Sequence, residues 1–214
     1  MKKLTHVLAL VLALVMALSL CVFASGEASG GPSGGASEEA TAPKTPGTTP
    51  AEVVMSAFAC RNFSDVPLTE EQVDAILAAG VNAPSAMNGE PWQFIVVENT
   101  EKKLGLISNE VATCIIVAVP MASYNLGANS QFAAGLAAES MYLFAHASGL
   151  AANMYVAPCD MTINVSAESK AEYGIAADWE AAIILGIGNF ADEIDAYASA
   201  SARSNVEEFV TVLE

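Results

Sequence analysis

The chain has 214 residues and a mass of 22.1 kDa, enough for one ordinary domain with additional segments. Acidic residues outnumber basic ones by 24 to 8, which gives a net charge of −16, and 53% of the residues are hydrophobic. No basic stripe is available for a phosphate backbone or an anionic lipid surface, so a general nucleic-acid binder is excluded and docking to anionic membranes is disfavoured. The hydrophobic content is too high for a disordered chain.

The first 24 residues predict a secretory signal peptide. Lys2 and Lys3 precede an uncharged run over residues 7–20, which is shorter than the ~20 residues that a membrane span needs. Val22 and Ala24 then supply the small residues that favour cleavage after Ala24. We therefore expect the protein to be exported, either to the extracellular space or to the outer face of the cytoplasmic membrane.

Two alternatives to simple cleavage stay open. The hydrophobic run could be retained as a membrane anchor. Cys21 could instead be lipidated, because residues 18–21 (LSLC) resemble a bacterial lipobox. Residues 25–50 follow, rich in Gly, Ser, Ala and Pro and without a large apolar side chain, so we expect a disordered, flexible linker. Residues 51–214 then form the single folded domain.

The folded part mixes helical and strand patterns. In chain order we expect a helix over residues 51–59, a helix opened by the capping box Thr69–Gln72, strands over 92–97 and 113–119, a long helix over 130–148, a strand over 153–157, a short helix over 166–173, a strand over 181–187 and an extended segment over 209–213. The spacing is too irregular for a series of βαβ units. It favours an α+β fold with a mixed central sheet covered by helices.

The chemistry-bearing residues exclude several kinds of site. Beyond the predicted signal peptide the chain has one histidine, His146, which disfavours a His-based triad or a multi-His metal centre. Cys60, Cys114 and Cys159 form no C-x-x-C pair; two of them could form a disulfide in an oxidising compartment, but their spacing does not say which. No phosphate-binding loop is present. We predict neither a metal site nor a catalytic side chain.

Two segments together carry a family resemblance. Cys60–Thr69 (CRNFSDVPLT) and Ala79–Val97 (AGVNAPSAMNGEPWQFIVV) resemble the nitroreductase-like family of FMN-dependent oxidoreductases, whose members open with R-R-S-x-R-x-F and continue with A-P-S-x-x-N-x-Q-P-W-x-F. Residues 135–150 are similar to the long central helix of that family, and residues 183–186 to its next strand. The resemblance spans residues 51–214. It implies a nitroreductase-like fold and an intertwined homodimer with the flavin between the subunits.

The resemblance also implies an FMN site. Its expected cofactor-binding residues are Arg61, Ser85, Asn88, Met154, Tyr155 and Arg203. The chain has only two arginines, and both match cationic positions of the family. Arg61 would face the edge of the flavin ring and the ribityl chain, where it would stabilise negative charge, and Arg203 would hold the phosphate.

The other four residues would act through their loops and backbone. Ser85 and Asn88 would donate hydrogen bonds to the flavin from the other subunit. The backbone at Met154 and Tyr155 would pass over the ring and present an N–H group towards N5. Plainer interpretations stay open: Ser85 and Asn88 also suit a turn between a helix and a strand, Met154 and Tyr155 suit an ordinary strand, and Arg61 could pair with a surface acid.

Four positions depart from the family pattern. Ala57 and Ala59 stand where the family has the first Arg and the Ser of R-R-S-x-R, Glu90 replaces the Gln, and Ser201 replaces a Lys near the last Arg. Loss of one charged contact to the phosphate would weaken FMN binding by about 1.5–3 kcal/mol.

The leading functional hypothesis is an exported FMN-dependent oxidoreductase that reduces a small organic acceptor such as a nitroaromatic or a quinone. Its electron donor would be NAD(P)H or a surface electron-transfer component. The main alternative is a non-catalytic cell-surface binding protein that kept the fold but lost tight FMN binding, as the replacements at Ala57, Ala59 and Ser201 suggest. A third hypothesis is a family member with different flavin chemistry, such as dehalogenation.

Overall fold

A computed structural model describes residues 49–121, 127–191 and 205–213, which all belong to one compact unit, Thr41–Glu214. The predicted signal peptide, Cys21 and nearly all of the predicted linker lie outside these ranges. Within the described ranges, no helix combines the length and the apolar character that a membrane crossing requires.

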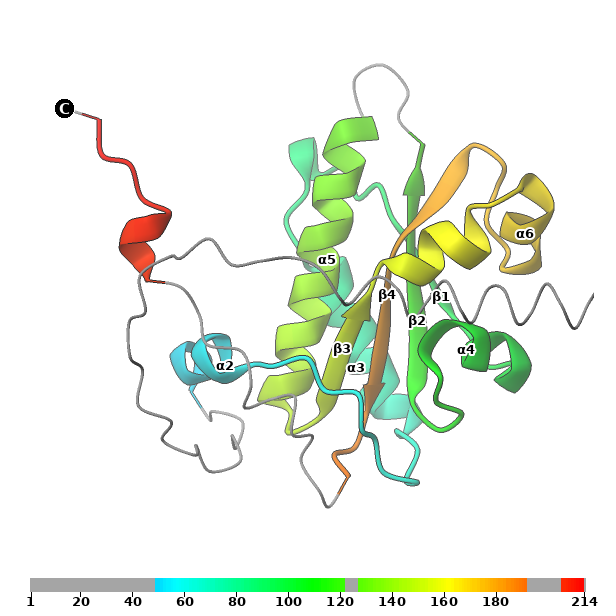
Figure 1. Ribbon diagram of the computed structural model, residues 1–214, viewed down its shortest axis with the longest axis horizontal. Coiled ribbons are helices and arrows are strands. Elements are labelled where there is room, and N and C mark those ends of the chain that lie inside the picture. Colours follow the sequence, from blue (N-terminus) through cyan, green and yellow to red (C-terminus); the bar gives the residue numbers. More distant parts are fainter. Residues whose placement is uncertain (1–48, 122–126, 192–204, 214) are drawn as a thin grey trace, which may run out of the picture. The chain divides into compact units, whose positions relative to one another are not determined.

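The centre of the fold is a four-stranded sheet (Figure 1). Its strands, in the order in which they lie side by side, are β1 (Gln93–Val96), β2 (Thr113–Pro120), β4 (Trp179–Gly188) and β3 (Ala151–Tyr155). All three described pairings are antiparallel. The prediction of an α+β fold is confirmed, but the expected mixed sheet is not what these four strands form, because none of them pairs in parallel.

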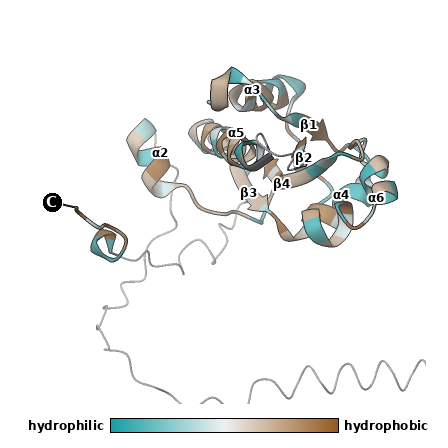
Figure 2. Ribbon diagram, turned by 90° about the horizontal axis from the view of Figure 1, so that it is seen from above, coloured by the Kyte–Doolittle hydropathy of each residue, from teal (hydrophilic) through white to brown (hydrophobic). Residues whose placement is uncertain are grey.

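Helices cover both faces of the sheet (Figure 2). One face carries α3 (Glu70–Val81) and α5 (Gly127–Ala147); the other carries α4 (Thr100–Ile107), the π-helical turn Cys159–Ile163 and α6 (Ala167–Glu172). A short helix, α2 (Pro50–Ser56), packs against α5. Two 3₁₀ turns, Ala86–Asn88 and Val206–Glu208, complete the described elements.

The core consists of two apolar layers, one on each side of the sheet. Successive side chains of a strand point to opposite faces, so Ile115 and Val117 of β2 pack with the α3 and α5 side, whereas Cys114 and Ile116 pack with the α4 side. All four are fully buried. The unbroken apolar run over residues 113–119 therefore predicted a central strand correctly.

Local signals explain where the two large helices begin and end. The Thr69 hydroxyl accepts a hydrogen bond from the Gln72 amide at 3.2 Å, and the Gln72 side chain accepts one from the Thr69 amide at 2.9 Å, which confirms the predicted capping box. Gly80 allows α3 to approach α5, since a Cβ atom there would lie 2.9 Å from Met141 Sδ. After α5, Gly149 adopts φ +75°, the left-handed conformation that glycine favours.

Some elements differ from the expectation. Helix α4 and the π-helical turn were not predicted, and β3 begins at Ala151 rather than at residue 153. The C-terminal residues 209–213 are exposed and form no described strand pairing.

Candidate functional site

The segment that carries Arg61 runs along the outer edge of β3. The Cys60 amide donates a hydrogen bond to the Ala152 carbonyl at 2.9 Å, and the Ser64 amide donates one to the Asn189 carbonyl, also at 2.9 Å. These contacts fix the backbone on both sides of Arg61, which lies at the edge of the sheet with its side chain exposed.

The Arg61 guanidinium makes no hydrogen bond or ion pair with any described residue, but its charge acts on Tyr155. Burial raises the pKa of Tyr155 most strongly, and Asn153 and Arg61 lower it in part, so that the net pKa lies above its ordinary value. The Tyr155 hydroxyl therefore stays protonated and can donate a hydrogen bond. Arg61 and Tyr155, predicted separately, are thus brought together.

The lysines of the described ranges are used differently from Arg61. Each donates hydrogen bonds from its ammonium group to backbone carbonyls of its own fold: Lys102 to Glu172, Lys103 to Glu110 at 2.8 Å, and Lys170 to Ala177 at 2.6 Å and Trp179 at 2.9 Å. In the described ranges, Arg61 is consequently the Lys or Arg side chain that remains available to an anionic ligand.

The backbone of Met154 faces the same open edge. The Ala152 carbonyl points away from β4 towards Cys60, and backbone groups on one side of a strand recur at every second residue, so the Met154 N–H also points outward. It has no backbone partner within the described ranges. The side chain of Met154 packs on the α5 side of the sheet, whereas that of Tyr155 packs on the α4 side.

Asn153 is a further candidate residue at this edge, and it was not among the residues predicted from the sequence. Its side chain is 3% exposed, and its Nδ2 atom has no hydrogen-bond partner among the described residues, although the carboxamide lies near enough to Tyr155 to lower the pKa of the phenol. A buried amide donor without a partner is costly and calls for an explanation. The available signal was a single amide within an otherwise apolar strand, Ala151–Tyr155.

Ser85 and Asn88 lie elsewhere. Ser85 precedes the 3₁₀ turn that leads into β1, and Asn88 is the last residue of that turn, at the edge of the sheet opposite β3. The Ser85 hydroxyl accepts a hydrogen bond from the Glu90 amide at 3.0 Å, and Met87, Asn88 and Glu90 all have left-handed φ values between 45° and 54°. No described contact within one chain joins this loop to Arg61. A role at the same site therefore stays a prediction that needs a second subunit.

The remaining sequence predictions fall into two groups. Arg203 and Ser201 lie outside the described residues. Ala57 is half-buried and Ala59 is exposed, both in the segment that leads to Arg61. Both therefore present methyl groups at positions where the resemblance implied contacts to FMN.

The three cysteines of the described ranges are buried in the core. They are Cys60, Cys114 and Cys159, and no disulfide joins any two of them. Burial raises the pKa of Cys114 and of Cys159 to about 12, which keeps both thiols protonated. In the described ranges, no three His, Cys, Asp or Glu side chains are grouped so that they could hold a metal ion.

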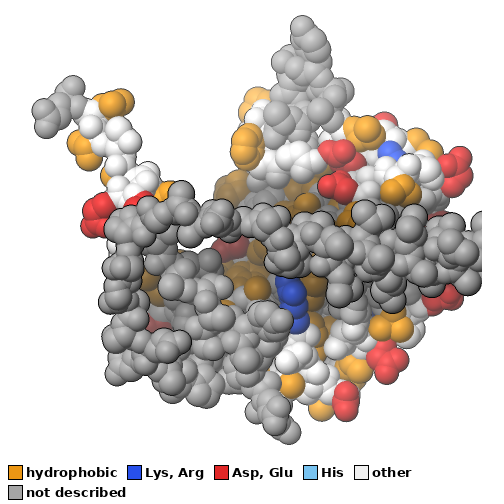
Figure 3. Space-filling view, in the orientation of Figure 1, with side chains coloured by type: hydrophobic (Ala, Val, Ile, Leu, Met, Phe, Trp, Pro, Cys, Tyr) orange, Lys and Arg blue, Asp and Glu red, His pale blue; other side chains and the backbone are white. Residues whose placement is uncertain are grey.

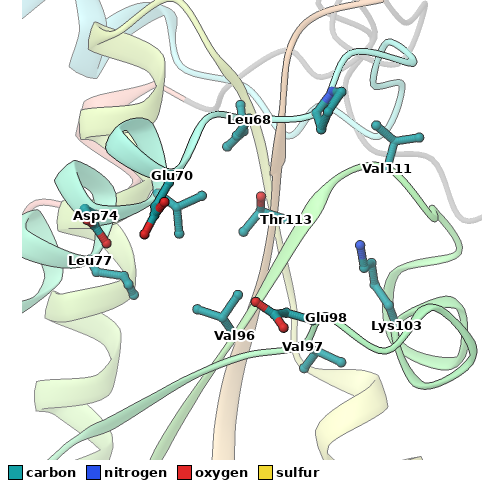
Figure 4. Close-up of a pocket in the computed structure, with 12 residues that line it drawn as sticks. Leu68, Glu70, Asp74, Leu77, Val96, Val97, Glu98, Lys103, Val111 and Thr113 are labelled. Carbon is teal, nitrogen blue, oxygen red and sulfur yellow. The ribbon is translucent and has the colours of Figure 1, made fainter.

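A pocket lies at the β1 edge of the sheet. This pocket of about 660 Å³ is open to solvent, and it has apolar walls and a charged rim (Figure 4). Leu68, Leu77 and Val96 line its apolar part, while Glu98 and Lys103 contribute charge. Arg61 does not line it, so this pocket is separate from the β3 edge.

Comparison with known proteins supports the family resemblance. A model of the nitroreductase family matches residues 54–125. A protein of Methanothermobacter thermautotrophicus, named "Putative NADH dehydrogenase/NAD(P)H nitroreductase", is 29% identical over 109 residues, which cover 47% of this chain and 57% of the relative. The chain thus spans little more than half the length of that curated relative.

Solved structures share the fold. A nitroreductase with bound FMN from Bacteroides fragilis matches with a TM-score of 0.61 and 19% identity, over 77% of this chain and 98% of that one. A "putative nitroreductase in complex with FMN" from Desulfovibrio desulfuricans matches with a TM-score of 0.63 and 23% identity, over 77% and 96%. The match over residues 54–125 and the shared fold together confirm the resemblance of this chain to the nitroreductase family.

Proposed function

We propose that the protein is an FMN-dependent oxidoreductase of the nitroreductase type, which reduces a small organic acceptor such as a nitroaromatic or a quinone. The observation that carries the proposal is Arg61, a cation that the fold holds at the β3 edge without a hydrogen-bond or ion-pair partner among the described residues. The FMN bound by two of the matching structures and the name of the curated relative support the same assignment.

The residues of the β3 edge fit a flavin. Arg61 would face the edge of the ring and stabilise negative charge there, and the outward Met154 N–H would donate a hydrogen bond to a ring nitrogen. The unpartnered amide of Asn153 and the protonated hydroxyl of Tyr155 add donors directly behind this edge. FMN, when bound, would supply the transfer of electrons from donor to acceptor, while these residues bind and orient it.

The direct test is the amount of FMN that the purified protein retains after removal of excess flavin. Arg61→Ala should weaken FMN binding by roughly ten- to a hundredfold, since it removes one charged contact of about 1.5–3 kcal/mol. Lys102→Ala is the matched control, because that ammonium is bonded to the Glu172 carbonyl within the fold. Unchanged FMN affinity in Arg61→Ala would remove the main support for the site.

The non-catalytic alternative has a test of its own. It predicts a colourless protein that retains no FMN, because Ala57 and Ala59 have replaced family contacts. The double variant Ala57→Arg and Ala59→Ser should then recover FMN binding, whereas a protein that already retains FMN should gain little. Retained flavin without turnover of any donor and acceptor would favour a binding function over an enzyme.

We further propose a homodimer, because the two halves of the predicted site lie at opposite edges of the sheet in one chain. Beside the Ser85 loop, a hollow of about 240 Å³ is bordered by Phe132 and Leu136 of α5, which are 73% and 45% exposed. Apolar side chains left in solvent at this position favour an interface. The second subunit would bring its Ser85 and Asn88 to the flavin.

The C-terminal segment supports the same assembly. Phe209 and Leu213 are 78% and 91% exposed, in a stretch of chain without a described strand partner. The open pocket beside β1 offers apolar walls and an unpaired strand edge (Figure 4). We propose that residues 209–213 of one subunit dock along this edge of the other.

Export is also part of the proposal, on the strength of the signal-like segment at residues 1–24. NAD(P)H is scarce outside cells, so a surface electron-transfer component would be an alternative donor. Fractionation of cells that express the full chain tests export, and mass spectrometry of the N-terminus separates cleavage after Ala24 from lipidation at Cys21. Full-length protein that stays in the cytoplasm would contradict the proposal.

A further inference from the structure

Positive charge is scarce in this protein, and its distribution is informative. The whole sequence has eight Lys and Arg residues against 24 Asp and Glu. On the face shown in Figure 3, acidic side chains are scattered over the described surface and basic ones are few. An incoming anion therefore meets a repulsive field, and it needs a specific cation to overcome that field.

The lysines cannot easily supply that cation. Lys103 and Lys170 are buried, at 9% and 7% exposure, and Lys170 is held by two carbonyls and by the Met121 sulfur at 3.5 Å. Lys102 donates to the Glu172 carbonyl and lies 5.3 Å from the centre of the Tyr173 ring. Moving any of these ammonium groups to a ligand would break hydrogen bonds that join α4 or α6 to its surroundings.

The turn that follows β3 adds negative charge beside the site. Cys159 donates a long hydrogen bond from its thiol to the Tyr155 carbonyl at 4.0 Å, so the π-helical turn lies directly against the end of β3. The next residue, Asp160, is exposed, and its charge helps to raise the pKa of Cys159. An exposed carboxylate thus lies in the turn that follows Tyr155 and the end of β3.

We propose that this site selects its electron donor by charge, and that it accepts a dihydronicotinamide without a 2′-phosphate (NADH) in preference to one that carries it (NADPH). A 2′-phosphate adds negative charge and is normally matched by a nearby Arg or Lys. Among the described residues, Arg61 is used by the flavin and the lysines are bonded internally; Arg203, outside these residues, is assigned by the family resemblance to the phosphate of the flavin. The inference rests on the proposed flavin-dependent function.

The test compares donors that differ in charge on the FMN-loaded protein with one fixed quinone acceptor. The donors are NADPH, NADH and the uncharged N-benzyl dihydronicotinamide. At an ionic strength of about 0.01 M, where the screening length is about 30 Å, kcat/KM should be roughly tenfold lower for NADPH than for NADH. At about 0.15 M the difference should shrink, because the screening length falls to about 8 Å.

A binding measurement gives a readout without turnover. Calorimetric titration should give a Kd for NADP⁺ roughly tenfold above that for NAD⁺ at low ionic strength. The ratio of the two Kd values should shrink at about 0.15 M ionic strength, as the ratio of the kcat/KM values does. Asp160→Asn should raise kcat/KM for NADPH more than for the uncharged donor. Glu101→Gln, which removes an exposed charge at the start of α4, is the matched control and should change the donor ratio less.

Two outcomes would overturn the inference, and they are distinguishable. If NADPH is used and bound as well as NADH or better at low ionic strength, a cation for the 2′-phosphate exists and the inference is wrong. If the uncharged donor still reduces the bound FMN in that case, the flavin-dependent function stands. Failure of all three donors to reduce bound FMN would overturn the proposed function, and the inference with it.

Discussion

The buried imidazole of His146 makes the stability of the protein depend on pH. Its imidazole is 2% exposed and lies among the rings of Tyr142, Phe58 and Phe190, at 4.6, 5.7 and 6.4 Å between centroids. Within the part of the chain that the structure describes, neither ring nitrogen has a hydrogen-bond partner. Burial lowers the pKa of His146 from 6.5 to about 4, and the backbone of Phe58 opposes this only in part. The folded protein therefore holds this imidazole neutral at mildly acidic pH.

The resulting pH dependence has a definite sign. Between pH 6.5 and about 4 the unfolded chain binds a proton at His146 and the folded chain does not, so the free energy of unfolding decreases as the pH falls through this window. The slope from this group approaches about 1.4 kcal/mol per pH unit. His146→Phe should flatten the slope measured by urea unfolding at several pH values, whereas Glu139→Gln, an exposed change on the same helix, should not. Identical slopes in wild type and His146→Phe would contradict the assignment.

At the level of single residues, the sequence allowed only part of the site to be predicted. Arg61 and Tyr155 were identified by family resemblance, but their proximity depends on the hydrogen bond between Cys60 and Ala152, which links segments some ninety positions apart. No local pattern specifies such a pairing. Asn153 was missed for a related reason: its lack of a partner is visible only once the neighbouring side chains are placed.

Helix α3 shows an element whose start is encoded locally. Both reciprocal hydrogen bonds of the Thr69–Gln72 capping box are present, and Ile76 anchors the buried side of the helix. Thr69→Ala should lower the free energy of unfolding by about 1 kcal/mol, because the Gln72 amide loses the Thr69 hydroxyl as its hydrogen-bond acceptor. Thr100→Ala, at an exposed first position of α4 rather than at a cap, is the control. Equal losses for the two variants in denaturant titrations would contradict a specific capping role.

Elements without such signals were predicted poorly. Helix α4 has a polar first half, and the side chain of its cap, Asn99, accepts a hydrogen bond from the Lys102 amide at 2.9 Å; because the third helical position is Lys102 rather than Glu or Gln, no capping box forms. The π-helical turn after Pro158 depends on packing against β4 rather than on a propensity of its own. Strands β2 and β4 were predicted well because burial on both faces leaves an unbroken apolar run.

The whole molecule raises the question of how one flavin site is completed. Arg61 lies beside β3, and the Ser85 loop precedes β1 at the other edge of the sheet. If the second subunit supplies that loop, FMN binds only to the dimer, and linkage requires that FMN also favours dimerisation. The apparent dissociation constant of the dimer should therefore fall as FMN is added, which light scattering at several protein concentrations would show.

A charge placed in the interface tests this coupling. Phe132 is 73% exposed in one chain and borders the hollow next to Ser85, so Phe132→Asp should bury a carboxylate in the dimer and favour the monomer. The monomer should also lose FMN, although Arg61 is untouched. Val165→Asp, which changes a residue that is 60% exposed beside α6, should leave both properties unchanged. A Phe132→Asp monomer that retains FMN at wild-type affinity would mean that the β3 edge alone binds the flavin, and that the Ser85 loop has only a structural role.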